Sequence, residues 1–469
     1  MNMMTLSEQI SEFITRFDLD TIPEAVIVRA HLHLLDTLGV AIAGTRQAAA
    51  VNARCVLSTL AKAPSHCHVW ASSITLSPEY AVLANGIAAH ALDFDDTHTD
   101  SITHGSAILV PLVMALSEDM NLSGKEMLSA YIIGWEVAAR VGLASQGSFH
   151  KRGFHTTPVA GIFGAASAAS RLLGLSAQEC AHAIGLAGSQ ASGVAEYLSN
   201  SSSSKCFHAG WAAHSAILAA RLAQAGMTGP LTIFEGRFGL FMTHGLHHSS
   251  VSGQIGRGLG QRWELLNVSI KPYPCCHFAH ASVDCVRMLR HDGIAPEDIV
   301  EIQCVVDPVA GALICEPAET KITPGTPYAA KFSLPWLAAT GMLDDGLSLR
   351  SFDATELDRP EVLALAEKIS FRYCEEGEIP FPEYFPGRII VTLTDGREVT
   401  KRLDINYGHP ENPMLPGDVE RKFRDNVNGI LKPRAADRII DLVNSLDNNP
   451  IIELSEQLSD IINLNDGSR

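Results

Sequence analysis

Acidic, basic and hydroxyl side chains gather in one short stretch, Ala91 to Ser106, with the sequence ALDFDDTHTDSITHGS. Apolar sequence typical of helices flanks it, at 80–92 and 107–116. Carboxylates, imidazoles and hydroxyls are the groups that proton-transfer chemistry uses. The stretch is therefore either a functional site or a solvated loop, and its composition alone leaves both readings open. Its polar residues are Asp93, Asp95, Asp96, Thr97, His98, Thr99, Asp100, Ser101, Thr103 and His104.

A second candidate is His155, in the sequence KRGFHTTPVAGIFG. It directly precedes a predicted helix that Thr156 or Thr157 could cap, with Pro158 near its first position. The free backbone N–H groups of such a helix end favour an anion beside the histidine. An exposed loop histidine fits the same sequence.

Two further stretches place cationic side chains close together. Lys205 follows a serine run in SNSSSSKCFHAG and is followed by His208, a set of donors suited to carboxylates, although a flexible polar loop explains it too. In KPYPCCHFAH, two prolines stiffen the backbone around Lys271, His277 and His280. A rigid basic segment suits a cleft site at a domain junction, but a structural crossover would look alike.

Charge and cysteine usage exclude several classes of protein. A formal net charge of −17 argues against nucleic acid as a partner, because phosphate binding needs a basic surface. Ten cysteines without a CxxC pair indicate reduced thiols rather than disulfides or an iron–sulfur cluster. The adjacent Cys275 and Cys276 are poorly placed for one metal, and His31 and His33 would point to different sides of a helix. We therefore predict no metal site.

Cofactor and hydrolase motifs are missing from the sequence. It contains no GxGxxG sequence that opens a helix after a strand and no Walker motif, so no nucleotide cofactor is predicted. GLAGSQASG does not fit the GxSxG pattern, which disfavours a serine hydrolase. No uninterrupted apolar run is long enough to cross a membrane, and the acidic, amphipathic N-terminus is unlike a targeting peptide. We expect a cytoplasmic protein without a membrane partner.

Hydrophobic periodicity predicts a mainly α protein with an α+β insertion. Small residues recur in the helical sequences GIFGAASAASRLLG and AGWAAHSAILAARLAQAG, which would allow helices to approach closely. Strand-like alternation appears at 298–308 and 386–403, with a hairpin turn at Thr394-Asp395-Gly396. We predict helical sequence at 1–267, an α+β domain at 268–402 and a helical return at 403–469. The predicted helices include 23–44, 79–91, 105–118, 124–143, 157–173, 177–188, 209–226, 280–292, 328–341 and 359–369.

Taken together, these stretches resemble the MmgE/PrpD family. The matching sequences are ALDFDDTH…THGS, GFHTTPVAGIFGAA, SSKCFHAGWAA, KPYPCCHFAH and AKFSLPW, which occur in the family's order over most of the chain. The resemblance implies a large all-helical domain formed by both chain ends, with a smaller inserted α+β lid domain. It also implies a homodimer.

The family it resembles acts without metal or cofactor on small di- and tricarboxylates. Its members include 2-methylcitrate dehydratase, cis-aconitate decarboxylase and an iminodisuccinate epimerase, which share proton transfer at a carbon next to a carboxylate. The resemblance implies that His104 or His155 moves the proton and that Asp93 orients a histidine or acts as the second acid or base. Lys205 and Lys271 would hold carboxylates. Thr97, His277 and His280 complete the expected substrate-binding set, while Asp95, Asp96 and His98 would shape the loop.

The leading hypothesis from the sequence is a cofactor-independent hydro-lyase of the 2-methylcitrate dehydratase type. An epimerase or a cis-aconitate-type decarboxylase needs the same proton transfer, and a silent dicarboxylate-binding protein is the alternative that is not an enzyme. The decarboxylases that it resembles carry a tyrosine on the first lid strand. The segment Val305-Val306-Asp307-Pro308 has none, which argues against decarboxylation.

Overall fold

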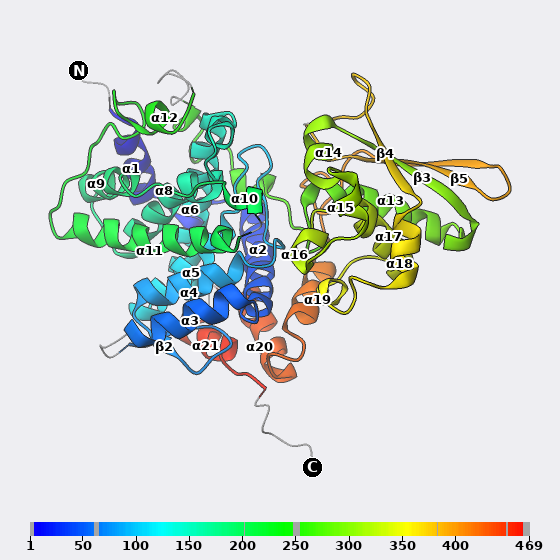
Figure 1. Cartoon of the computed structure of the whole chain (residues 1–469). Coiled ribbons are helices and arrows are strands. Elements are labelled where there is room, and N and C mark those ends of the chain that lie inside the picture. The colour runs from blue at the N-terminus through cyan, green and yellow to red at the C-terminus, as the bar shows by residue number, and fades with distance from the viewer. Residues whose placement is uncertain are drawn as a thin grey trace, which may run out of the picture. The chain divides into compact units, whose positions relative to one another are not determined.

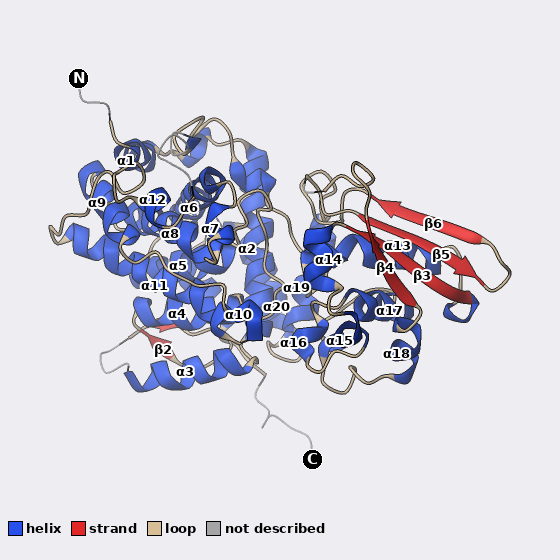
Figure 2. Ribbon diagram, turned by 45° about the horizontal axis from the view of Figure 1, so that its top comes forward, coloured by secondary structure: helices blue, strands red, loops and turns tan. Residues whose placement is uncertain are grey.

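The computed structural model describes residues 4–60, 65–200, 202–246, 254–381, 383–446 and 449–462. The chain divides into two compact units: unit 1 comprises Met1–Ile270 and Leu415–Arg469, and unit 2 comprises Lys271–Met414. Helices dominate both units (Figure 2), so the mainly α prediction is confirmed. The division at 268 and 402 stays a prediction of where the domains begin and end.

Unit 1 is built from helices that pack around a fully buried centre. In α5 (Ser106–Asp119), α6 (Gly124–Ser145) and α8 (Thr156–Leu172), buried residues occupy nearly every position rather than one face. Such helices lie inside a domain, and the polar loop that precedes α5 is largely buried with them. The surrounding elements are α1 (Leu6–Arg16), α2 (Glu24–Gly44), α3 (Ala48–Leu60), β1 (Cys67–His68), β2 (Thr75–Leu76), α4 (Pro78–Ala89), α7 (Ser148–Lys151), α9 (Ala177–Gly188), α10 (Tyr197–Asn200), α11 (Ser204–Gln224) and α12 (Leu240–Thr243).

Three of these helices begin at capping boxes that are visible in the sequence. Thr5, Ser123 and Ser176 each accept a hydrogen bond from the backbone N–H three residues later, and a glutamate at that position bonds back. This satisfies N–H groups that have no partner inside the helix. The predicted start of α9 at Ala177 agrees with the structure to the residue.

Glycines let the central helices approach more closely than any side chain would permit. A Cβ added to Gly164 of α8 would lie 2.3 Å from the carbonyl oxygen of Gly134 of α6. A Cβ on Gly86 of α4 would lie 2.6 Å from the Cα of Gly210 of α11. The expected close approach of Gly/Ala-rich helices is therefore confirmed at these crossings.

The C-terminal part of the chain returns to unit 1 as α19 (Pro416–Val427), α20 (Pro433–Asn444) and α21 (Ile451–Leu458). Figure 1 shows these orange and red helices beside the blue N-terminal ones, and α19 packs along α2 while α21 contacts α5. By length and mean hydropathy, α2 and α6 could each cross a membrane. However, 67% and 94% of their apolar windows are buried within the protein, as in core helices.

Unit 2 contains a four-stranded sheet in the order β4-β3-β5-β6. β3 (Ile299–Val306) runs antiparallel to β5 (Gly387–Leu393) and parallel to β4 (Ile369–Tyr373), and β6 (Glu398–Leu403) completes the predicted hairpin with β5. The parallel pair requires a long crossover, which contains α14 (Pro308–Ile314), α15 (Ala318–Ile322), α16 (Pro327–Ala330), α17 (Leu334–Asp344) and α18 (Pro360–Ala366).

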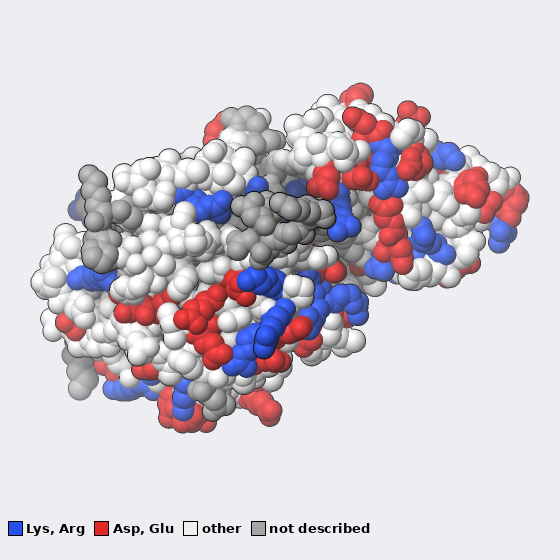
Figure 3. Space-filling view, turned by 90° about the horizontal axis from the view of Figure 1, so that it is seen from below, with Lys and Arg blue, Asp and Glu red and all other residues white. Residues whose placement is uncertain are grey.

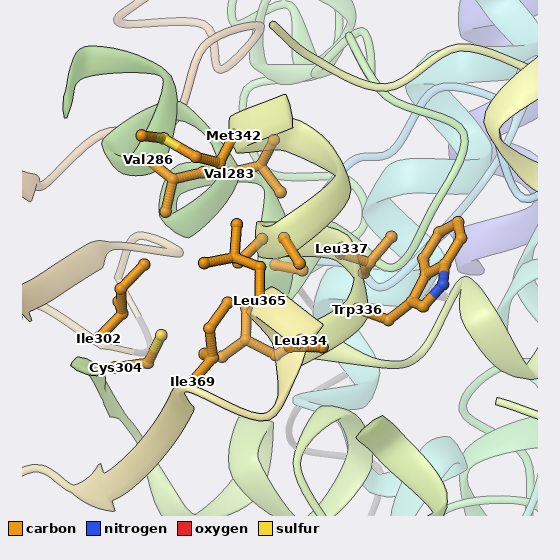
Figure 4. Packing of buried hydrophobic residues seen from close by; sticks show 14 of the residues in the cluster. Val283, Val286, Ile302, Cys304, Leu334, Trp336, Leu337, Met342, Leu365 and Ile369 are labelled. Carbon is orange, nitrogen blue, oxygen red and sulfur yellow. The ribbon is translucent and has the colours of Figure 1, made fainter. Parts of the chain in front are cut away.

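The core of unit 2 lies between this sheet and two helices, α13 (His280–His291) and α17. Figure 4 shows Val283 and Val286 of α13 near Met342 of α17, with Ile302 and Cys304 of β3 on the sheet side. All five side chains are fully buried. Buried positions alternate along β5, as the sequence pattern of that strand predicted, whereas β3 is buried at most positions from Ile302 onward.

In unit 2, two predicted helices differ from the structure in number or extent. The helix expected at 328–341 is divided into α16 and α17, because the Ser333 side chain caps a new helix by accepting from the N–H of Trp336. The helix expected at 359–369 ends at Ala366, and Ile369 begins β4, where pairing with β3 overrides local helical periodicity.

Charged side chains of both signs are mixed over the face shown in Figure 3. Exposed pairs include Lys432 with Asp460 at 2.7 Å and Arg438 with Glu453 at 2.5 Å. Such pairs contribute little stability in water. The stability of the fold must therefore come mainly from the buried helices described above.

The glycine contact between α6 and α8 leads to a first prediction. Replacing Gly164 with Ala should destabilise the protein by about 1–3 kcal/mol, because the new methyl group must displace the Gly134 carbonyl. Gly417→Ala is the matched control, since its Cβ would meet nothing within 4 Å and alanine favours the α19 helix. Urea denaturation of both variants tests this, and equal stability of the two would contradict it.

Candidate active site

Five predicted site residues lie in unit 1, each on a segment next to a helix end. The loop between α4 and α5 carries Asp93, Thr97 and His104. His155 occupies the position directly before α8, and Lys205 lies in the first turn of α11. The predicted start of α11 at Ala209 was wrong, because the helix begins at Ser204 and includes the lysine.

Four histidine rings and one tyrosine ring form a contiguous cluster in this unit. His90 lies 5.4 Å from both His104 and His155, measured between ring centroids, and is nearly parallel to His155. His155 lies 5.3 Å from His208 and 5.6 Å from Tyr197. The structure therefore brings the predicted His104 and His155 into one site through His90, which connects them.

The loop that holds Asp93 is ordered and buried, not solvated. Two antiparallel bridges fix it: Thr97 pairs with Ser269, and His98 pairs with Thr103. Asp93 has a φ of 55°, in the left-handed region that costs a non-glycine residue energy. Such strained positions concentrate at functional sites, where the surrounding structure maintains them. Of the two readings of this loop, the structure favours a site.

Hydrogen bonds determine which nitrogen of His104 can accept a proton. Its Nδ1 lies 2.8 Å from the backbone oxygen of Asp96, and because a carbonyl only accepts, Nδ1 must carry the hydrogen. Thr97 Oγ1 lies 3.1 Å from the same nitrogen. In the neutral ring the lone pair therefore lies on Nε2, which is the nitrogen suited to act as a base.

The start of α8 differs from the expected capping arrangement. His155 occupies the cap position, and no side chain caps the helix there. The Thr157 hydroxyl instead accepts a hydrogen bond from the backbone N–H of His104 at 3.1 Å. The hydroxyl thus ties the loop of His104 to the helix that follows His155. Pro158 is the third residue of α8, not the first.

Asp96 organises the buried side of the loop. Its carboxylate accepts hydrogen bonds from Nδ1 of His33 at 2.8 Å and from Oγ of Ser106 at 2.5 Å. Ser106 also contacts the hydroxyl of Tyr131 at 2.6 Å and accepts a hydrogen bond from the indole of Trp135 at 3.0 Å. All of these side chains are buried, so this network of hydrogen bonds holds the backbone oxygen that orients His104.

A lysine from the C-terminal return supports the same loop. Nζ of Lys422, on α19, lies 2.6 Å from the Asp36 carboxylate and donates to the backbone oxygen of Phe94 at 3.1 Å. It also lies 3.7 Å from the centroid of the Phe94 ring. Burial raises the pKa of Asp36, and the charge of Lys422 opposes that rise. The position of Phe94, next to Asp93, thus depends on a helix more than 300 residues away in the chain.

His90 forms a dyad with Asp95 that the sequence analysis did not identify. Its Nδ1 lies 2.6 Å from Asp95 Oδ2, and both side chains are fully buried. Nδ1 of His104 lies 3.7 Å from the same carboxylate oxygen. The available signal in the sequence was the spacing of five residues between His90, directly after α4, and Asp95 in the loop. It was missed because His90 reads as part of an apolar helix.

His155 and His208 face each other through their Nδ1 atoms, which are 3.1 Å apart. Burial lowers the pKa of His155 well below its usual value, and burial also lowers the pKa of His208, to about 4. Positive potential from His90 and Lys205 adds to both shifts. Both rings are therefore neutral near pH 7, the state in which an imidazole can take up a proton.

Lys205 donates a hydrogen bond to the carboxylate of Asp93, and both side chains are buried. The same lysine lowers the pKa of the nearby Tyr197, but burial outweighs it and the net pKa is raised. The tyrosine therefore keeps its proton at neutral pH. A substrate carboxylate would find a cation and a hydroxyl donor here, next to the histidine rings.

The remaining predicted residues belong to unit 2, where all three are buried. His277 Nε2 lies 2.9 Å from the side-chain amide of Asn406, and His280 Nε2 lies 3.2 Å from the backbone oxygen of Cys275. Lys271 is 2% exposed. Substrate binding by Lys271, His277 and His280 stays a prediction from the sequence.

One group of potential metal ligands occurs elsewhere in unit 1. His66, Cys67 and Asp119 place ligand atoms within 4.8 Å of one another. Burial, together with nearby carboxylates, raises the pKa of the Cys67 thiol, so its thiolate is disfavoured. Asp119 ends α5, whereas His104 precedes its first residue, which puts the group at the far end of a helix about 20 Å long.

The lowered pKa of His208 predicts a pH-dependent stability. Because the unfolded histidine titrates near 6.5 and the folded one near 4, its contribution is complete above pH 6.5 and is lost as the pH falls towards 4. His208→Asn removes this titration. When the pH falls from 7 to 4.5, the free energy of unfolding of the wild type should therefore decrease by up to roughly 3 kcal/mol more than that of the variant. Urea denaturation across this range measures it, and a constant difference would contradict it.

Comparison with known proteins assigns this chain to a family. The sequence matches the MmgE/PrpD N-terminal domain over residues 8–249 and the MmgE/PrpD C-terminal domain over residues 273–448. The chain is 29% identical to human cis-aconitate decarboxylase over 461 residues, covering 95% of this chain and 93% of the relative. It is 27% identical to the cis-aconitate decarboxylase of Aspergillus terreus (strain NIH 2624 / FGSC A1156) over 474 residues, covering 96% and 95%.

The mouse cis-aconitate decarboxylase is 27% identical over 456 residues, covering 95% of this chain and 92% of the relative. Similarity therefore extends over both compact units and nearly the full length of each relative. The two domain matches cover most of the sequence and follow each other in order. This protein is a member of the MmgE/PrpD family.

Proposed function

We propose that this protein is a lyase acting on a small tricarboxylate, and that decarboxylation of cis-aconitate is its reaction. The observation that carries the proposal is the full-length similarity to cis-aconitate decarboxylases at 27–29% identity. It supports the decarboxylase alternative better than the dehydratase hypothesis that the sequence favoured. The buried histidine cluster beside Lys205 supplies the chemistry that such a reaction needs.

Decarboxylation of cis-aconitate couples the loss of CO₂ to a proton transfer. The bond between the methylene carbon and its carboxylate breaks, and that electron pair forms a new double bond to the central carbon. The old double bond accepts a proton at the carbon next to another carboxylate. The site must therefore deliver one proton and stabilise negative charge on the carboxylate beside that carbon.

The residues of unit 1 can divide these tasks. Lys205 provides a buried positive charge, which is paired with Asp93 in the structure. A substrate carboxylate would replace Asp93 as the partner of this lysine. Nε2 of His104 or of His155 exchanges the proton with the reacting carbon. The contacts of His104 Nδ1 with the Asp96 backbone oxygen and with Thr97 Oγ1 hold the ring in place before substrate binds.

A hydro-lyase of the 2-methylcitrate dehydratase type is the second candidate, favoured by one observation. The resemblance leads one to expect a tyrosine on β3 in decarboxylases, and the end of β3 here is Val305-Val306. The neighbouring Tyr373 pairs with Val306 from β4, but its hydroxyl donates to the Glu316 carboxylate at 2.5 Å. The hydro-lyase would use the same proton transfer with hydroxide as the leaving group.

Proton NMR in D₂O separates these reactions. The chelator-treated protein is incubated in turn with cis-aconitate, 2-methylcitrate, citrate and iminodisuccinate. We expect cis-aconitate to yield CO₂ and an exo-methylene product. Water loss from 2-methylcitrate instead would establish the hydro-lyase, and deuterium exchange in iminodisuccinate without elimination would indicate an epimerase. Binding of a polycarboxylate without turnover would leave the silent binding protein.

Substitution of site residues gives a quantitative prediction. His155→Ala and Lys205→Ala should each lower kcat by at least about 10²-fold, as expected when a positioned proton-transfer or charge-stabilising group is removed. His150→Ala is the matched control, because His150 is an exposed histidine only five residues from His155. Near-normal activity of both site variants, measured with the substrate that the NMR panel identifies, would refute the site assignment.

A further inference from the structure

The contact between His155 and His208 constrains where protons can sit. Their Nδ1 atoms are 3.1 Å apart, a hydrogen-bond distance. Two bare nitrogens would repel each other, and two N–H groups would clash, so one hydrogen must lie between them. The tautomers of the two rings are therefore coupled: when His208 donates through Nδ1, His155 carries its hydrogen on Nε2, and the reverse also holds.

The outer nitrogens of the pair remain for exchange. Within the described part of the chain no residue hydrogen-bonds to Nε2 of His155 or of His208, and neither atom is among the enclosed polar atoms that lack a partner. Neither nitrogen is thus held by another described residue, and the two side chains are 7% and 8% exposed. Nε2 of His90 differs, because it is enclosed and has no hydrogen-bond partner among the described residues.

The surroundings keep the pair aligned. The backbone N–H of His155 donates to the oxygen of Gly193 at 2.9 Å. A Cβ on Gly193 would lie 3.4 Å from Cγ and Nδ1 of His208 and 2.6 Å from Cγ of Pro158. Gly193 has a φ of 118°, so both its conformation and its space require glycine. The His90 ring, stacked on His155, limits the tilt of that ring from the other side.

We propose that His208 is a positioning residue that relays protons to His155 across this contact. The inference rests on the proposed function, in which His155 exchanges a proton with the substrate. In the delivery direction, His208 takes a proton from water at Nε2 and passes its Nδ1 hydrogen to Nδ1 of His155. His155 then gives its Nε2 hydrogen to the substrate carbon. One proton enters, one leaves, and both rings are neutral again, with the hydrogen of the contact now on His155. After the product leaves, His155 takes a proton from water at Nε2, its Nδ1 hydrogen moves back to His208, and His208 releases its Nε2 hydrogen to water, which restores the starting tautomers.

The reverse sequence serves proton abstraction. His155 takes the substrate proton at Nε2, its Nδ1 hydrogen moves to His208, and His208 releases its Nε2 hydrogen to water. Because nearby His90 and Lys205 disfavour charge on either ring, neither ring holds the added proton for long. The relay thus lets a pair that is neutral at rest move one proton at a time.

Two variants distinguish a relay from simple positioning. In His208→Asn the amide reproduces the hydrogen bond at the Nδ1 position but cannot carry a proton through. His208→Ala removes both functions. The relay predicts that kcat falls by at least about 10-fold in both variants with KM little changed, as for a lost proton-transfer step, and that added imidazole rescues only the alanine variant. Full activity in His208→Asn would overturn the relay.

A measurement without substrate tests the contact independently. In ¹⁵N spectra of protein with labelled histidines at pH 7, two Nδ1 resonances should show coupling to the same hydrogen. His208→Asn should abolish this shared coupling. His182→Asn is the matched control, because His182 is bonded to the backbone of Gly229 in a different part of unit 1. Separate, uncoupled Nδ1 resonances in wild type would refute the relay whatever the substrate is. If the shared hydrogen is present but the protein converts none of the compounds in the NMR panel, only the proposed reaction is refuted.

Discussion

The whole arrangement depends on the burial of one charged loop among apolar helices. A carboxylate removed from water is costly unless hydrogen bonds and opposite charges compensate for it. Asp96 is fully buried and meets that requirement with His33 of α2 and Ser106 of α5. Because Asp96 also offers its backbone oxygen to His104, the bonds that make its burial tolerable are the ones that orient a candidate catalytic ring. Removing one partner would leave a buried charge and a misplaced histidine together.

The same reasoning bears on the proposed polyanionic substrate, because the chain as a whole has a net charge of −17. The local field around His155 is set by Lys205 and by buried imidazoles, not by the distant surface carboxylates, which salt screens. Lys422 adds a second buried cation, held by Asp36 beneath Phe94. Elements from residue 36 to residue 422 thus converge on one loop, and the site needs both ends of the chain.

Sequence reasoning succeeded where a signal is local. The start of α9 was predicted to the residue. The alternation of apolar and polar residues at 298–308 identified β3, and the alternation at 386–403 with its turn identified the hairpin of β5 and β6. The loop from Asp93 to His104 was found because its polar residues are consecutive. The Gly/Ala-rich helices were recognised as closely packed because small residues recurred at helical spacing.

What the sequence could not show depends on contacts distant along the chain. His90 belongs to the end of an apolar helix, and only the fold puts its ring against His104 and His155. His208 was noted as one donor in a polar stretch, but its Nδ1 contact joins residues 53 positions apart. β4 was not predicted, and the predicted helix at 359–369 extended to its first residue, because the five residues of β4 gain their strand character from pairing with β3. Tertiary pairing outweighs local preference in each case.

The central claim is that buried histidines of this unit transfer a proton to a specific carbon of a tricarboxylate. The most direct test is the position of deuterium in the product that wild-type protein forms from cis-aconitate in D₂O. Delivery by a fixed ring predicts one deuterium per molecule. It should lie on a single face of the carbon that takes up the proton in the proposed reaction. Deuterium scattered over several carbons, or an equal mixture of both faces, would contradict the account.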